Sequence, residues 1–174
     1  MTDTTTRMTR LKVLAIISSL VFASLGSMAI LTQPRTAYAQ QSQTFTAKLT
    51  GKDEVPPVST QATGMAQFQQ SPDGKEINYD LTATNLQGFM MAHIHQGKAG
   101  ENGQPVAPLS MGKGKITSSD LKGLLAGKQI SDLVDLMKNG GAYVNIHTQE
   151  NQNGEIRGQI MSGSSSQGRT LFTQ

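Results

Sequence analysis

The segment GAYVNIHTQENQNGEIRGQI at residues 141–160 contains two runs of alternating apolar and polar residues joined by a turn. Val144 and Ile146 carry the alternation in the first run, and Ile156 and Ile160 carry it in the second. A period of two is typical of a strand with one buried face, and two such runs around a glycine-containing turn predict an antiparallel hairpin. This hairpin sets the expectation of an antiparallel β domain.

The same alternation occurs earlier in the chain, at residues 45–50, 64–68 and 77–83. These segments are expected to be half-buried antiparallel strands. The sequence Ser71-Pro72-Asp73-Gly74 has the chemistry of a tight turn, because proline presets φ and glycine accepts a left-handed conformation. Phe68 and Ile77 are both expected to face inward but differ in parity, which predicts a bulge in this hairpin.

Three other segments do not fit a central strand. Residues 51–58 contain Pro56-Pro57, which cannot donate to a ladder, so they are expected to form a loop. Residues 96–115 are rich in glycine and proline and are expected to form a long connection. Residues 118–139 are the helical candidate, with capping residues at the start and Gly140 at the end. The predicted fold is therefore an all-β, antiparallel, Greek-key-like β-sandwich with one short helical insertion.

The N-terminus resembles an export signal. Basic residues precede an apolar run at 13–31, and Ala37-Tyr38-Ala39 has the small-x-small pattern of a signal peptidase site. Residues 1–39 are thus predicted to be a signal peptide, with an uncleaved N-terminal membrane anchor as the alternative. The β domain is expected at 40–161, followed by a disordered Ser/Gly/Gln-rich tail at 162–174.

The charge of the chain is concentrated in this N-terminal segment. Of the 15 basic and 12 acidic residues, the segment contains Arg7, Arg10, Lys12, Arg35 and Asp3. The exported part then has 11 residues of each sign and lacks the basic surface that nucleic-acid binding requires. There is no cysteine, so disulfides and thiolate metal sites are excluded. The expected location is secreted or otherwise extracytoplasmic.

All three histidines of the chain lie in two predicted strands, His93 and His95 in one and His147 in the other. Because side chains alternate along a strand, His93 and His95 share one face. The opposite face of the two strands is apolar and is expected to pack into the core: Ala92, Ile94, Val144 and Ile146. The histidines then lie on the outer face, exposed to water unless the glycine-rich segment after His95 covers them.

The C-terminal hairpin supplies neighbours for His147. Residues that face each other across a hairpin must point to the same side, so His147 is expected to face Glu155 or Arg157. Two histidines two residues apart on a strand, with a third on a nearby strand, form a three-nitrogen set suited to copper or zinc. The predicted site has three ligands and three surrounding residues: His93, His95 and His147, with Met91, Glu155 and Arg157.

Other interpretations of these residues stay open. In the alternative interpretation, the imidazoles hydrogen-bond the long loop and organise it. Calcium bound by Asp53, Glu54 and Glu101 is a weaker hypothesis, because these carboxylates lack EF-hand spacing. No nucleophile triad or pair of catalytic carboxylates stands out, so no reaction is assigned.

Three motifs resemble a known family: GKDEVPPV at 51–58, AHIHQGKAGENGQPV at 92–106, and the opening segment at 141–160. Together they are similar to the CHRD domain, named for chordin, over about residues 45–160. The resemblance implies an extracytoplasmic β-rich module of largely unassigned role, found in many secreted microbial proteins. It favours a secreted or surface-tethered binding module with an unknown extracellular or cell-surface ligand.

A looser similarity connects the histidine pattern to the Cu/Zn superoxide dismutases, which are Greek-key sandwiches with a His-x-His on an outer face. That resemblance implies at most a mononuclear copper or zinc protein. The two metals of a dismutase need more imidazoles than three, and its disulfide needs cysteines that this chain lacks.

Overall fold

The computed structural model describes residues 42–163. The predicted signal peptide at 1–39 and most of the predicted tail, residues 164–174, lie outside the described residues. In the described part, no helix combines the length and the apolar character needed to cross a membrane.

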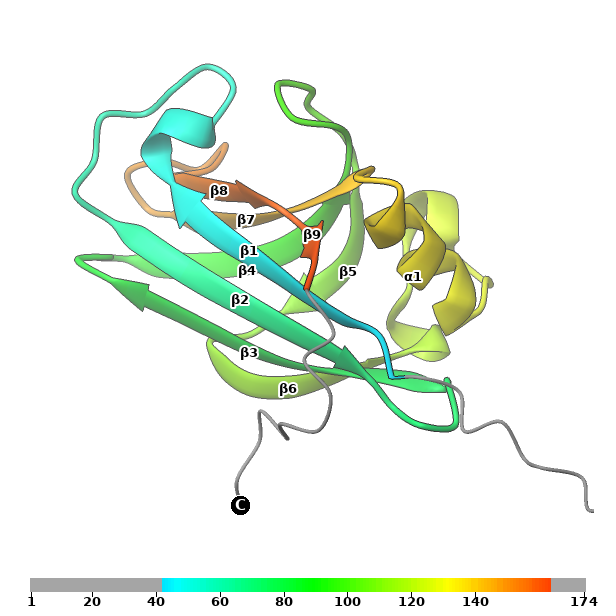
Figure 1. Ribbon diagram of the computed structural model, residues 1–174. Helices are drawn as coiled ribbons and strands as arrows, with labels where there is room; N and C mark the ends of the chain where they lie inside the picture. Colours follow the sequence, from blue (N-terminus) through cyan, green and yellow to red (C-terminus); the bar gives the residue numbers. More distant parts are fainter. Residues whose placement is uncertain (1–41, 164–174) are drawn as a thin grey trace, which may run out of the picture. The chain divides into compact units, whose positions relative to one another are not determined.

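Nine strands, three 3-10 turns and one α-helix make up this part of the chain (Figure 1). In chain order they are β1 (Thr44–Thr50), η1 (Gly51–Asp53), β2 (Thr63–Gln70), β3 (Glu76–Thr84), β4 (Phe89–Gln96), β5 (Pro105–Leu109), β6 (Gly112–Thr117), η2 (Ser118–Asp120), η3 (Gly123–Leu125), α1 (Ile130–Lys138), β7 (Ala142–Thr148), β8 (Ile156–Gln159) and β9 (Met161–Ser162). All strand pairs are antiparallel.

The sheet has the strand order β5-β4-β7-β8-β1-β2-β3-β6, with β9 paired to β1. Its two halves pack face to face, and their inward side chains form one apolar core (Figure 1). The end strands β5 and β6 follow each other in the chain and are separated only by Ser110 and Met111, which nearly closes the sheet. One half contains β5, β4, β7 and β8, and the other contains β1, β2, β3 and β6. The connections from β3 to β4 and from β6 to β7 therefore cross from one half to the other. The predicted Greek-key-like sandwich is confirmed.

The predicted long connection at residues 96–115 is wrong, because it contains β5 and most of β6. Pro105 and Pro108 lie in β5, which is an end strand of the sheet and therefore tolerates residues without an N–H donor. In β6, a Cβ at Gly114 would lie 2.3 Å from the Tyr79 hydroxyl oxygen. These prolines and glycines reflect an edge position and close packing rather than a loop.

The hairpin of β2 and β3 has the predicted turn but lacks the predicted bulge. Gly74 has a φ of 72°, and the Ser71 hydroxyl donates to Asp73 over 2.6 Å. The register is continuous and pairs Phe68 with Tyr79. The bulge prediction is wrong, because the unbroken register pairs even-numbered residues of β2 with odd-numbered residues of β3, such as Phe68 with Tyr79 and Gln70 with Ile77. Inward residues of different parity therefore need no extra residue.

The helical insertion and the C-terminal hairpin are confirmed. Residues 118–139 contain two 3-10 turns and α1, which buries one apolar face: Ile130, Leu133, Val134 and Met137. β7 and β8 pair as an antiparallel hairpin. The last strand, β9, ends at Ser162, one residue beyond the predicted domain boundary.

Candidate metal centre

The outer face of β4 and β7 carries the three histidines, as the alternation predicted. In the β4–β7 ladder, Ala92 pairs with Ile146 and Ile94 with Val144, and all four are buried in the core. His93, His95 and His147 point to the opposite side. His95 and His147 are nevertheless only 8% and 9% exposed. Loops therefore cover this face, and β7 is buried along its whole length.

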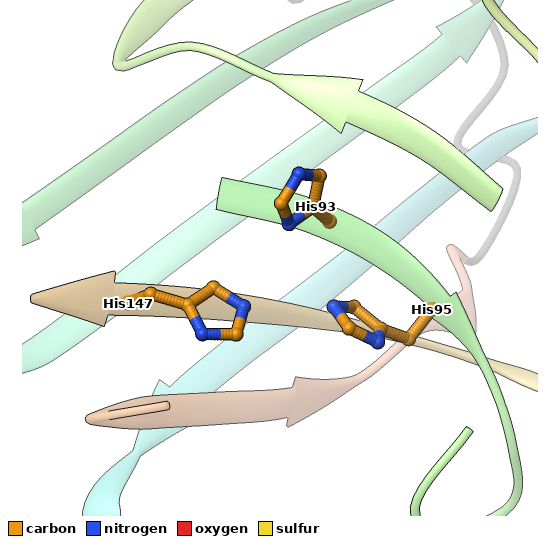
Figure 2. Close-up of side chains that lie close together, drawn as sticks. All are labelled: His93, His95 and His147. Atoms are coloured by element: carbon orange, nitrogen blue, oxygen red, sulfur yellow. The ribbon is translucent and has the colours of Figure 1, made fainter. Parts of the chain in front are cut away.

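The three imidazoles form a nearly equilateral triangle (Figure 2). The ring centroids are 5.6 Å apart for His93 and His95, 5.6 Å for His93 and His147, and 5.7 Å for His95 and His147. One nitrogen from each ring lies within 4.8 Å of the other two. The centre of this triangle therefore lies within about 2.8 Å of each of the three nitrogens. A bond between a metal ion and an imidazole nitrogen is roughly 2.0–2.1 Å long. Ring movements below about 1 Å would bring them to bonding distance of one ion.

Backbone carbonyls fix the tautomers of two of the rings. His95 Nδ1 lies 2.8 Å from the Gly103 carbonyl oxygen, and His147 Nδ1 lies 2.9 Å from the carbonyl oxygen of Gln152. A carbonyl oxygen only accepts, so each Nδ1 carries the proton and each Nε2 has a free lone pair. A backbone carbonyl that orients a histidine in this way is the usual arrangement around a metal ligand.

The nitrogens that face the centre of the triangle have no hydrogen-bond partner within the described structure. They are His93 Nδ1, His95 Nε2 and His147 Nε2, and all three atoms are buried. The pKa of His95 is lowered to about 4, mainly by burial and also by the neighbouring His147, His93 and Arg157, while its bond to Gly103 opposes the shift. Burial and the neighbouring His147 also lower the pKa of His93. Neutral imidazoles are the form that a metal ion requires.

Tyr143 and Arg157 support His95 from the side. Tyr143 pairs with His95 across the ladder, and their rings stack with centroids 5.1 Å apart and an angle of 20°. The Arg157 guanidinium lies 3.5 Å from the centroid of the Tyr143 ring. Arg157 is only 2% exposed, so this cation–π contact is shielded from water.

The same arginine fastens the loop that covers His95, residues 97–103. Its guanidinium donates to the carbonyl oxygens of Lys98 and Glu101 over 2.9 and 2.8 Å, and to Asn102 Oδ1 over 3.2 Å. Gly103, at the end of this loop, donates its N–H to the Tyr143 hydroxyl over 3.1 Å. Arg157 thereby holds in place the loop whose last carbonyl orients His95.

Comparison with known proteins gives one match. The sequence model of the CHRD domain matches residues 45–160, which is more than half of the chain. The chain belongs to the CHRD domain family. CHRD domains are typical of extracellular proteins. No curated protein and no solved structure matches the chain, so the resemblance to Cu/Zn superoxide dismutase has no support from these comparisons.

In this CHRD domain the three motifs that carry the family resemblance meet around the histidines. The segment 92–106 supplies His93, His95 and the covering loop, and the segment 141–160 supplies His147 with its supporting tyrosine and arginine. The segment 51–58 reaches the same face, because the Val55 carbonyl accepts a hydrogen bond from Asn102 over 2.7 Å. The motifs are separate in sequence but form one cluster in space.

The residues predicted to surround the ligands have different positions. Arg157 faces Asn145 in the β7–β8 ladder, and the same register places Glu155 opposite His147. The Glu155 carboxylate, however, accepts hydrogen bonds from Thr60 over 2.8 Å and Thr148 over 2.7 Å. Glu155 therefore ties the β1–β2 loop to β7, and these hydrogen bonds go to hydroxyl groups rather than to an imidazole. Met91 lies opposite His147 in the β4–β7 ladder and is 44% exposed.

The predicted site did not include Asn145, nor Glu54, which is hydrogen-bonded to it. Asn145 lies opposite His93 in the ladder and donates to Glu54 Oε2 over 3.4 Å. Burial raises the pKa of Glu54 to about 7, although the positive charge of Arg157 opposes this. Alternation along the strand does place Asn145 on the face of His147. Glu54 could not be placed in this way, because only the folding of its loop brings it here.

The calcium hypothesis gains no geometric support. Asp53 accepts from the Thr50 hydroxyl and Glu101 from the Lys98 N–H, both within their own loops. Among residues 42–163, the one group of three or more histidines or carboxylates with converging ligand atoms is the histidine triangle.

Proposed function

We propose that this CHRD domain is an extracytoplasmic binding module that holds one transition-metal ion, copper or zinc, between His93, His95 and His147. The observation that carries the proposal is the convergence of three buried, unpartnered ring nitrogens on one point. Histidines that only organised loops would need the Nδ1 bonds that His95 and His147 make. Their free Nε2 atoms would have no reason to meet.

The chemistry of the donors favours copper and zinc. Neutral imidazole is a good ligand for both, while calcium and magnesium prefer oxygen. Three protein ligands leave a further coordination position, which a water molecule or another donor can occupy. No catalytic step is assigned to the site. The export pattern at residues 1–39 is consistent with a location outside the cytoplasm, where the ligand would be acquired.

The proposal is tested by titrating chelator-treated protein, purified without a polyhistidine tag, with Cu(II) and with Zn(II) in a calorimeter. We expect one ion per chain with a sub-micromolar dissociation constant for at least one metal. His95→Ala should weaken binding at least about tenfold, or ~1.4 kcal/mol. Binding should also become weaker as the pH falls, because protons compete for the same nitrogens.

A matched variant separates ligation from loop organisation. In His95→Asn the amide N–H can still donate to the Gly103 carbonyl, but the Nε2 ligand is gone. If the histidine is a ligand, both His95→Asn and His95→Ala lose affinity. Absence of binding, or binding unchanged when all three histidines are replaced, would leave loop organisation as the role of the cluster.

A further inference from the structure

The sulfur atom of Met91 completes the histidine site, we propose, as a fourth ligand, and the ion that the site selects is copper in the Cu(I) state. This inference rests on the proposed metal function and makes it more specific. It starts from the position of Met91 in the sheet, which the three-histidine argument does not use.

Met91 occupies the open end of the outer face. It pairs directly with His147 across the β4–β7 ladder and lies two residues before His93 on β4, so all three side chains point to the same side. Directly opposed residues in such a ladder have Cβ atoms about 4.5–5.5 Å apart. At the other end of the site, His95 is stacked on Tyr143 beneath the 97–103 loop. The free coordination position is therefore most accessible from the side of Met91.

The exposure and chemistry of Met91 fit a displaceable ligand. It is 44% exposed, and an unbranched side chain with three rotatable bonds can reach a nearby ion without backbone movement. A thioether is a soft donor that binds Cu(I) well. Zn(II) in proteins is bound by imidazole, thiolate and carboxylate instead. A thioether among the ligands therefore favours copper over zinc.

The test compares Met91→Leu with wild type, using Cu(I) and Zn(II) alone as probes. Cu(I) affinity is measured anaerobically by competition with bicinchoninate, and Zn(II) affinity by calorimetry. We expect Met91→Leu to weaken Cu(I) binding at least about tenfold and to change Zn(II) binding by less than about twofold. Met161→Leu is the control, because Met161 is also exposed but lies on β9, away from β4. X-ray absorption of the Cu(I) protein should show a copper–sulfur path that is lost in Met91→Leu.

Three outcomes would overturn the inference, and they differ from one another. Cu(I) affinity unchanged in Met91→Leu, with histidine-dependent metal binding intact, would remove Met91 as a ligand but leave the metal centre. An equal loss of Cu(I) and Zn(II) affinity would show that the substitution disturbs the site in general. No binding of any metal would refute the proposed function together with this inference.

Discussion

Replacing Glu54 by glutamine is expected to change how the stability of the metal-free protein depends on pH. Glu54 is only 5% exposed, and its Oε1 and the neighbouring Asn145 Oδ1 both lack a hydrogen-bond partner in the described structure. A protonated carboxyl group or a glutamine amide has a hydrogen to donate to such an oxygen, whereas an ionised carboxylate has none. The structure therefore accommodates a neutral side chain at this position better than a charged one.

The sign and the size of the effect follow from linkage. Burial raises the pKa of Glu54 from 4.5 to about 7, so between these pH values the folded state binds more protons than the unfolded state. The free energy of unfolding therefore falls as the pH rises through this range, and the loss is complete above it. At roughly 1.36 kcal/mol per pH unit, the upper limit of the loss is about 3 kcal/mol. Glu54→Gln does not titrate and escapes this loss.

The assay is urea unfolding of chelator-treated wild type and Glu54→Gln at about pH 4.5, 6 and 8. The stability advantage of the variant should grow with pH, by at most about 3 kcal/mol over the range. Effects of the histidines are common to both proteins and cancel in the difference. Glu150→Gln, at the exposed tip of the β7–β8 hairpin, is the control. A difference that does not depend on pH would refute the claim that burial keeps this carboxyl group protonated.

Two further predictions concern the loop over His95. Arg157→Lys loses the flat guanidinium that makes three hydrogen bonds to residues 97–103, so amide hydrogen exchange in that loop should become at least about tenfold faster, with a stability loss of roughly 2–4 kcal/mol. Gly103→Ala places a Cβ 1.8 Å from the Gln96 carbonyl oxygen, so the backbone must move and His95 loses its acceptor. Metal affinity should then fall, measured by calorimetry, while the far-UV circular dichroism spectrum stays β-dominated.

Strand alternation was sufficient to predict which face the histidines occupy. It places His147 out of phase with Val144 and Ile146, and the parity of the C-terminal hairpin correctly limits its facing residue to Glu155 or Arg157. These are properties of the backbone, and the period of two fixes them as soon as the strands are located. The same rule places Tyr143 and Asn145 on the outer face together with His147, and the ladder pairs them with His95 and His93.

The strands β5 and β6 and the orientation of the imidazole rings could not be predicted, because they depend on tertiary contacts that leave no pattern in the neighbouring sequence. β5 and β6 contain Pro105, Pro108 and Gly114, which indicate a loop unless one knows that β5 is an end strand and that Gly114 lies against Tyr79. The convergence of the imidazole nitrogens depends on the orientation of the rings. The carbonyl groups that orient His95 and His147 lie eight and five residues away in the sequence. The false bulge had another cause: inward residues of the two strands were assumed to share parity, whereas an unbroken antiparallel register can pair even with odd numbers, as β2 and β3 do.

The burial of the outer face supports the proposal that the histidines bind a metal ion. A two-layer antiparallel domain usually leaves its outer faces to water, yet all seven residues of β7 are buried. A buried polar atom without a partner costs about 1–3 kcal/mol, and here three such nitrogens face one another. Water could satisfy them one at a time, whereas a single cation would accept all three lone pairs at once. Burying three imidazoles with unpaired nitrogens is unfavourable when each stands alone, but it becomes favourable when the three nitrogens share one bound ion. The convergence of the nitrogens favours the shared ion over three separate imidazoles.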